Sequence, residues 1–148
     1  GGYDRTGSRS PMQWDKTLNA GFSLASPEKL YIKQDESDDR PDAESQIADE
    51  NSLYNEIRKL ISIRRSHSAL GNNSEIEFIY AEKNEYPLAF IRSSEDEKIL
   101  VIINPADREV SFPCEYKPKE AVYSFGREIA YEDKKITVPP CSAGFYRV

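Results

Sequence analysis

Near Gly71 the hydrophobic pattern of this chain changes from a helical period to an alternation of apolar and polar residues. Before that point, one helical face is formed by Leu53, Ile57, Leu60 and Ile61. After it, short runs with a period of two are separated by turn residues, a pattern that is typical of strands. The order predicts a single helix followed by a domain made of strands.

The helix is predicted to run roughly from residue 51 to residue 67. It begins after Asp49, Asn51 and Ser52, which are all residue types that cap helix N-termini. It ends at the stop signal around Gly71. Basic residues fill its last turns, where they complement the helix dipole, and we interpret them as a solvated face.

Eight short strands are predicted after the helix, at nearly regular spacing. The run Ile99–Ile103 is apolar throughout and predicts a central strand. The pattern predicts an antiparallel β-sandwich of the Greek-key type. The candidate strands are Ile76–Ala81, Leu88–Ser93, Lys98–Asn104, Glu109–Pro113, Ala121–Phe125, Glu128–Tyr131, Lys135–Val138 and Ala143–Arg147.

The first 48 residues are predicted to be loop, because Pro and Gly interrupt them and few apolar residues are present. Gln34–Arg40 is a hydrophilic run, and Leu30–Ile32 is predicted to form a short strand or one helical turn. A loop of this length is unusual inside a compact domain. We therefore expect its packing partner to lie elsewhere in the protein.

Composition excludes several classes of partner. The formal net charge is −6, and the chain has no basic cluster of the kind that neutralises phosphates. Nucleic acid and membrane are therefore not expected as partners, and no apolar run approaches the ~20 residues of a spanning helix. The start Gly1-Gly2-Tyr3 lacks both an initiator Met and a signal-peptide pattern, and it fits a segment of a longer protein. The location is unknown, with a cytoplasmic parent as the expectation.

Cys and His residues form no recognisable metal or redox motif. Cys114 and Cys141 fall in predicted strand regions, and we interpret them as small, semi-buried apolar residues. His67 is the only His and lies near the end of the predicted helix, where positive charge is favoured. We interpret it as a capping residue. The sequence predicts no metal site and no cofactor.

The most specific motif lies in the first loop. Arg5-Thr6-Gly7-Ser8-Arg9-Ser10-Pro11-Met12-Gln13-Trp14-Asp15 holds the only Trp and the only Met of the chain, and Asn19–Ser23 follows it. A polar, aromatic segment without a hydrophobic period is typical of a loop that carries a site. It resembles the Arg-Thr-Pro-Met-Gln-Trp-Asp loop of the α-amylase superfamily, glycoside hydrolase family thirteen, especially its α-glucosidase and oligo-1,6-glucosidase branch.

Two later segments extend this resemblance. Asn51–Leu70 resembles the last helix of the family's (β/α)8 barrel, and Ile99–Asn104 resembles a strand of its C-terminal sandwich, domain C. The resemblance implies three parts: a long loop after barrel strand eight (1–50), the last barrel helix (51–70) and domain C (71–148).

The resemblance implies no catalytic residue in this chain, because the catalytic Asp and Glu residues of the family lie on earlier barrel strands. It places the loop on the aglycone side of the sugar pocket, at the catalytic face. There Arg5, Arg9 and Gln13 can hydrogen-bond sugar hydroxyls, and Trp14 can stack on a sugar ring. In the alternative, structural interpretation, Arg9 pairs with Asp15 and Trp14 fills a gap beneath the loop.

The resemblance therefore implies the C-terminal part of a retaining hydrolase of α-linked glucosides, with this part itself non-catalytic. Its partners would be the missing catalytic barrel and an α-glucan or oligosaccharide substrate. Two alternatives stay open: a carbohydrate-binding accessory module that uses strand tyrosines, or part of a trehalose synthase or sucrose-isomerising transglycosidase. The helix face would lack its barrel sheet in the isolated chain, which predicts self-association.

Overall fold

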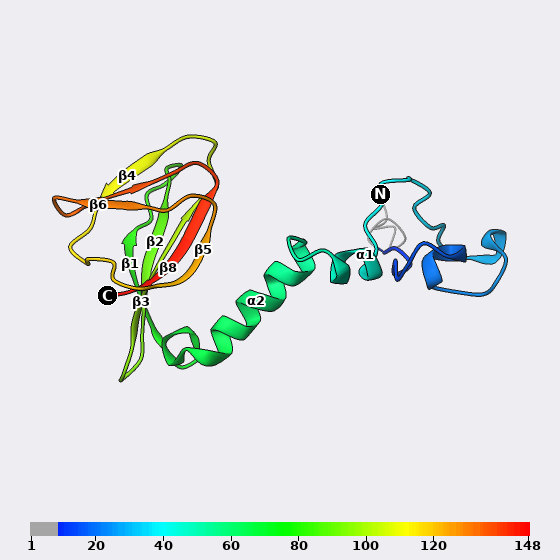
Figure 1. Cartoon of the computed structure of the whole chain (residues 1–148), viewed down its shortest axis with the longest axis horizontal. Helices are drawn as coiled ribbons and strands as arrows, with labels where there is room; N and C mark the ends of the chain where they lie inside the picture. The colour runs from blue at the N-terminus through cyan, green and yellow to red at the C-terminus, as the bar shows by residue number, and fades with distance from the viewer. Residues whose placement is uncertain (1–8) are drawn as a thin grey trace, which may run out of the picture. The chain divides into compact units, whose positions relative to one another are not determined.

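The computed structural model describes residues 9–148, so Arg5 lies outside the described residues. The chain divides into two compact units, Gly1–Leu60 and Ile61–Val148 (Figure 1). In the first unit, the turns η2 (Leu18–Gly21) and η3 (Pro27–Lys29) precede helix α1 (Ala43–Ala48). Helix α2 (Leu53–Ser66) starts within the first unit, close to the predicted residue 51, and it ends in the second.

Two predictions for the first unit were wrong. Residues 43–48 form α1 rather than loop, because Asp42 caps this helix by accepting a hydrogen bond of 2.8 Å from the Ser45 amide. The six-residue helix is too short and too polar to show a hydrophobic period. Residues 30–32 form neither a strand nor a helical turn. The described part of this unit contains no strand with which they could pair.

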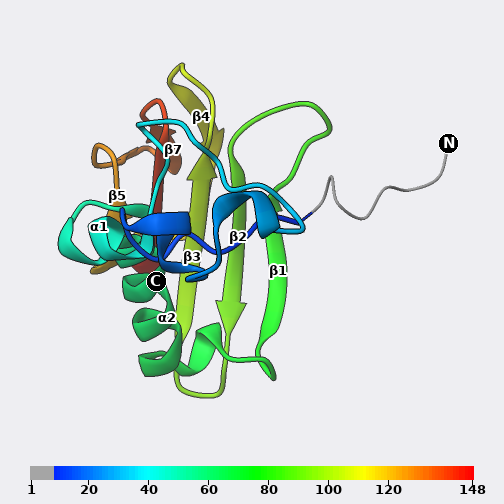
Figure 2. The same ribbon diagram turned by 90° about the vertical axis from the view of Figure 1, so that its right-hand side faces the viewer.

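The second unit is the antiparallel β-sandwich that the sequence predicts, and the strands lie within two residues of their expected bounds. One sheet has the order β1-β2-β3-β8-β5 and the other has the order β4-β7-β6 (Figures 1 and 2). A short turn, η4 (Ser68–Leu70), connects α2 to the first sheet. The strands are β1 (Glu75–Tyr80), β2 (Leu88–Ser93), β3 (Lys98–Asn104), β4 (Val110–Pro113), β5 (Ala121–Phe125), β6 (Ala130–Glu132), β7 (Lys135–Val138) and β8 (Ser142–Arg147).

The main core lies between the two sheets. Alternate residues of the five-stranded sheet, such as Ile91, Leu100 and Ile102, pack against Phe112 and Ile136 of the three-stranded sheet. All five side chains are at most 1% exposed. The predicted central strand Ile99–Ile103 is indeed central, since β3 pairs with β2 on one side and β8 on the other.

The end of helix α2 is fastened to the sandwich through Glu97. The carboxylate of Glu97 lies 2.7 Å from the His67 ring nitrogen Nδ1, 3.2 Å from the Ala69 amide nitrogen and 3.3 Å from the Arg147 guanidinium. Its side chain is only 9% exposed. His67 thus does more than complement the helix dipole, because it also anchors the chain leaving the helix.

This cluster predicts a specific loss of stability in acid. Burial raises the pKa of Glu97, but the hydrogen bonds from His67 and Ala69 and the charge of Arg147 outweigh it and hold the pKa below its ordinary 4.5. A depressed pKa stabilises the fold above the unfolded-state value, and that stability is lost as the pH falls through the folded-state pKa. Below pH 4.5, the melting temperature of the unmodified chain should therefore fall more steeply than that of Glu97→Gln.

Thermal melts across the acidic range measure this difference. The matched control is Glu95→Gln, an exposed position in the turn before β3, and its curve should follow that of the unmodified chain. Parallel curves for all three proteins would contradict the assigned role of Glu97.

Candidate functional site in the first unit

The segment that carries Gln13 and Trp14 is held against the start of α1. The carbonyl oxygens of Gln13 and Trp14 accept hydrogen bonds of 2.9 Å from the amides of Ala43 and Glu44. These amides belong to the first turn of a helix, where no partner within the helix is available. The loop therefore supplies the missing acceptors. This pairing fixes the backbone positions from which the Gln13 and Trp14 side chains project.

A left-handed turn closes the loop behind Trp14. Asn19, Ala20 and Gly21 have φ angles of 52°, 54° and 70°, and the Ala20 carbonyl accepts a hydrogen bond of 2.8 Å from the Trp14 amide. A Cβ atom on Gly21 would lie only 2.7 Å from the Asp15 carboxylate. A side chain at position 21 would therefore be strained at this φ angle and would also crowd Asp15.

The structural interpretation, in which Arg9 pairs with Asp15 to hold the loop, is only partly correct. Asp15 does hold the loop, but its carboxylate accepts hydrogen bonds from the Thr17 amide at 2.8 Å and from the Thr17 hydroxyl at 2.5 Å. Among the ion pairs of residues 9–148, none joins Asp15 to Arg9. The Arg9 side chain is thus not required for holding Asp15.

The junction of the two helices places Tyr54 beside this loop. The Asn55 side-chain amide donates hydrogen bonds to the carbonyls of Gln46, Ile47 and Asp49, at 3.1, 3.1 and 2.9 Å. The Ser52 hydroxyl also donates to the Gln46 carbonyl, at 2.5 Å. These bonds satisfy the last carbonyls of α1 and set the direction in which α2 begins.

Gln13 and Trp14 come together in one cavity of about 510 Å³. Met12, Asp42, Gln46 and Tyr54 also line it. Trp14 and Tyr54 are 53% and 46% exposed, so both rings remain available to a ligand. Aromatic faces next to a few polar groups suit sugar rings, whose apolar faces stack and whose hydroxyls need hydrogen-bond partners.

Arg9 lines a neighbouring cavity rather than this one. That cavity has a volume of about 240 Å³ and is lined also by Phe22, Leu30 and Tyr31. Ser10 and Pro11 line both cavities. Of the predicted sugar-contacting residues, the three in the described part of the chain, Arg9, Gln13 and Trp14, thus lie on one continuous segment but line two adjacent cavities.

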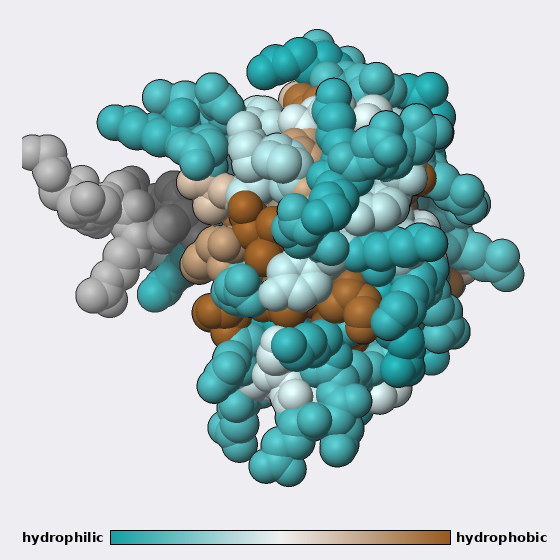
Figure 3. Space-filling view, turned by 90° about the vertical axis from the view of Figure 1, so that its left-hand side faces the viewer, coloured by the Kyte–Doolittle hydropathy of each residue, from teal (hydrophilic) through white to brown (hydrophobic). Residues whose placement is uncertain are grey.

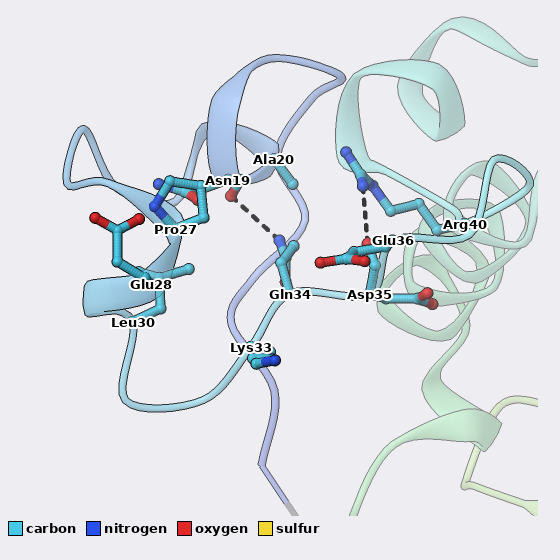
Figure 4. Close-up of a pocket in the computed structure, with 10 residues that line it drawn as sticks. All are labelled: Asn19, Ala20, Pro27, Glu28, Leu30, Lys33, Gln34, Asp35, Glu36 and Arg40. Atoms are coloured by element: carbon cyan, nitrogen blue, oxygen red, sulfur yellow. Dashed lines mark hydrogen bonds between the residues drawn. The ribbon is translucent and has the colours of Figure 1, made fainter.

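A further polar cavity of about 400 Å³ lies where residues 19–20 face residues 27–40 (Figure 4). Gln34 donates a hydrogen bond of 3.2 Å to the Asn19 carbonyl, and Arg40 donates one of 2.8 Å to the Asp35 carbonyl (Figure 4). The Gln34 Oε1 has no hydrogen-bond partner among the described residues. None of the described residues that line this cavity is aromatic, and its hydrogen bonds hold the loop together.

Sequence reasoning missed Asp42, Gln46 and Tyr54 as part of the first cavity. Asp42 could have been found, because Asp is a preferred N-cap residue and the acidic Glu44 follows it in the first helical turn. Hydrogen bonds from the Ser45 amide and hydroxyl lower the pKa of Asp42. It is therefore an ionised helix cap rather than a free acid, and it is the one acid among the described residues lining this cavity.

Glycoside hydrolysis needs two carboxyl groups on either side of one sugar bond. The cavity of Gln13 and Trp14 does not provide such a pair among its described residues. No group of three or more His, Cys, Asp or Glu side chains within residues 9–148 is arranged to hold a metal ion. In the same part of the chain, no helix is long and apolar enough to span a membrane.

Cys114 and most tyrosines of the sandwich have packing roles. Cys114 is buried, as a small apolar residue is expected to be, whereas Cys141 is exposed, so the prediction of a semi-buried residue was wrong there. Both are free thiols. Tyr123 and Tyr146 are buried. Three more tyrosines pack against the main core, namely Tyr80, Tyr116 and Tyr131. Tyr86 is 44% exposed.

Two family models match the chain, one after the other. Residues 2–73 match the model of the α-amylase catalytic domain, and residues 76–144 match the model of the maltogenic amylase C-terminal domain. The junction between the two matches falls in the loop between η4 and β1.

Similar proteins of known activity are several times longer than this chain. The oligo-1,6-glucosidase of Parageobacillus thermoglucosidasius is 28% identical over 97% of this chain and 26% of its own length. The trehalose-6-phosphate hydrolase of Bacillus subtilis is 32% identical over 73% of this chain and 18% of its own length. The crystal structure of the trehalulose synthase MutB from Pseudomonas mesoacidophila matches with a TM-score of 0.79 and 27% identity, over 97% of this chain and 26% of that one. The chain thus spans about a quarter of the first relative and of this structure.

Proposed function

Because the chain belongs to the α-amylase superfamily and carries the end of its catalytic domain together with its C-terminal domain, we propose that it completes a glycoside hydrolase acting on α-linked glucosides. In this proposal the catalytic carboxyl groups come from a catalytic barrel outside these 148 residues. Residues 1–50, which include the short helix α1, form the long connection after barrel strand eight, 51–70 the last barrel helix and 71–148 domain C. The chain alone is non-catalytic.

The observation that carries this proposal is the cavity shared by Gln13, Trp14 and Tyr54. A half-exposed indole beside an amide and a phenol offers both stacking and hydrogen bonding to a pyranose. Gln13 contributes a side chain that can both donate and accept hydrogen bonds to sugar hydroxyls. Arg9, in the adjacent hollow, contacts the same oligosaccharide farther along its length.

The hydrolase is favoured by the oligo-1,6-glucosidase and trehalose-6-phosphate hydrolase among the relatives. A transglycosidase is the second candidate, because a trehalose synthase and a trehalulose synthase match the chain as well. Both candidates place residues 9–14 on the side of the leaving sugar. They differ in what accepts the glucosyl group, which is water in one case and a second sugar hydroxyl in the other.

Substitution of Trp14 tests the proposed sugar contact. The test protein is a chimera in which the part of the P. thermoglucosidasius enzyme that precedes its matched region is followed by residues 1–148 of this chain. Trp14→Ala should raise KM for isomaltotriose about tenfold, with a smaller change in kcat, because losing a stacking contact of about 1.4 kcal/mol weakens binding tenfold. Steady-state kinetics measure both constants.

Leu24→Ala is the control, because Leu24 is 98% exposed and lines neither cavity. An unchanged KM in both variants would contradict the sugar contact. The chimera cannot decide between the candidates, because its catalytic barrel comes from an oligo-1,6-glucosidase. Chromatography of the products made by the complete protein that contains this chain decides between them: free glucose supports hydrolysis, and a rearranged disaccharide supports the transglycosidase.

We also propose that the apolar face of α2 packs against the missing barrel in the complete protein. None of the residues of α2 is buried in this chain. In the isolated chain this face is uncovered, and we expect it to cause self-association.

A further inference from the structure

The hydrophilic run Gln34–Arg40 contains a side chain that turns inward and bonds to the loop of the candidate site. All residues from 33 to 39 are exposed except Gln34, which is partly buried. Its Nε2 donates a hydrogen bond of 3.2 Å to the Asn19 carbonyl (Figure 4) and a weaker one of 3.4 Å to the Met12 carbonyl. One side-chain amide therefore joins two points of the loop that are seven residues apart in the sequence.

These two carbonyls lie next to the groups that set the position of Trp14. Met12 precedes Trp14 by two residues in the chain. Asn19 directly precedes Ala20, whose carbonyl accepts a hydrogen bond of 2.8 Å from the Trp14 amide. The Gln34 amide therefore ties the segment that leads into Trp14 to the turn that closes behind it.

The turn at Asn19 has a strained backbone that side-chain contacts stabilise. Asn19 and Ala20 have φ angles of 52° and 54°, which residues other than glycine adopt at an energetic cost. The Asn19 side-chain amide donates hydrogen bonds to the carbonyls of Ser23 and Ala25, at 2.8 and 2.7 Å. These bonds fasten the turn to the segment that follows it, whereas the Gln34 amide fastens the turn to the segment that precedes it.

The orientation of the Gln34 amide follows from the two carbonyls that it faces. Nε2 can donate to both, whereas the reverse orientation would set the amide oxygen against two other oxygens. The Oε1 atom is buried and has no hydrogen-bond partner among the described residues. A buried oxygen without a partner destabilises a fold. The stabilising contribution of this side chain therefore comes from its donor group.

We propose that Gln34 is a positioning residue of the sugar site, because its amide holds the backbone from which the Trp14 ring projects toward the sugar. This inference rests on the proposed function, which supplies the sugar contact. Gln34 lines the polar cavity of Figure 4 and does not line the cavity of Trp14. It therefore acts on the sugar only through the loop, and loss of its donor weakens sugar binding while the chemical step changes little.

Trp14 fluorescence in the isolated chain tests the positioning without any substrate. Trp14 is the only Trp of the chain, so the fast component of its anisotropy decay reports the local motion of this one ring. Gln34→Met removes the donor at nearly the same side-chain length, and Gln34→Glu replaces the donor by an acceptor. In both variants the fast component should grow toward that of the chain in urea. Leu24→Glu adds the same charge as Gln34→Glu at a loop position that is 98% exposed, and it should change nothing.

The sandwich provides an internal reference for these variants. Gln34 belongs to the first compact unit, and the sandwich belongs to the second and has its own buried core. The side of the sandwich that carries β4 and β6 is mostly hydrophilic, with apolar side chains visible only in a limited central area (Figure 3). The melting temperature of the strands, read by circular dichroism, should therefore be the same in all variants.

Steady-state kinetics of the chimera test the link to the sugar. Gln34→Met should raise KM for isomaltotriose about fivefold with nearly unchanged kcat, since one ordinary hydrogen bond corresponds to about that factor in binding. Leu24→Glu should leave both constants unchanged. The separation of KM from kcat distinguishes a positioning residue from a residue that takes part in the chemical step.

An unchanged anisotropy decay in Gln34→Met would overturn the proposal, whatever the kinetics show. A raised KM for Trp14→Ala together with an unchanged KM for Gln34→Met would also overturn it, as would equal effects of Leu24→Glu and Gln34→Glu. A strand melt that shifts with Gln34→Met would indicate a general structural role instead. If Gln34→Met frees the ring but Trp14→Ala leaves KM unchanged, the positioning of Trp14 by Gln34 stands and the proposed sugar contact fails.

Discussion

Asn104→Leu is expected to destabilise the full chain by about 3 kcal/mol or more, which corresponds to a melting temperature about 10 °C lower. Asn104 ends β3 and is 1% exposed. Its side-chain amide donates hydrogen bonds to the carbonyls of Arg108, Val138 and Pro139, at 3.0, 3.3 and 2.8 Å. Its Oδ1 accepts one of 3.1 Å from the Ala106 amide.

Leucine has the same branched shape and the same number of side-chain heavy atoms but none of these polar groups, so the substitution leaves buried backbone groups without partners. Each such group costs about 1–3 kcal/mol. Thermal melts of the two proteins measure the effect, with Asn73→Leu in the exposed loop before β1 as the matched control. A melting temperature for Asn104→Leu that equals that of the control would show that the network does not stabilise the sandwich.

The double substitution Ile57→Lys and Ile61→Lys is expected to convert a self-associating chain into a monomer. These two residues are four apart on α2 and are 48% and 51% exposed, so they lie on one face of the helix. Leu53 and Tyr54 extend the same apolar area, at 72% and 46% exposed. Lysine at exposed helix positions costs little helix stability, whereas it places charge in any apolar contact.

Sedimentation velocity over a range of concentrations measures the change. Ser62→Lys is the control, because it adds a lysine to the same helix outside the apolar stripe. The unmodified chain and the control should associate as concentration rises, and the double variant should not. A clean monomer for all three at high concentration would remove the proposed role of this helix face.

The parts of the fold that repeat a local pattern were predictable from the sequence. Helix α2 and the strands were found because each presents a hydrophobic period over five or more residues or lies between clear turn residues. The short helix α1 was not found, because six residues, half of them polar, are too few to show a period. Its cap at Asp42 was a usable signal, but Pro41 and the hydrophilic run before it favoured a loop.

Interactions between distant residues were not predictable. Asn104 has no sequence feature that foretells its bonds to residues 138–139, and nothing in the sequence pairs His67 with Glu97, which is 30 positions away. The candidate site likewise combines residues that a local motif predicts with a residue that only tertiary contacts bring in. Gln13 and Trp14 were found from a motif, whereas Tyr54 joins them only because Asn55 and Ser52 fasten the two helices together.

The most direct test of the account compares two proteins on one substrate, a chromogenic α-glucoside. Purified residues 1–148 should release no glucose from it, and the chimera that supplies the preceding part of the P. thermoglucosidasius enzyme should release glucose. Glucose release by the isolated chain, at constant specific activity through successive purification steps, would contradict the claim that the bond-breaking carboxyl groups lie outside it.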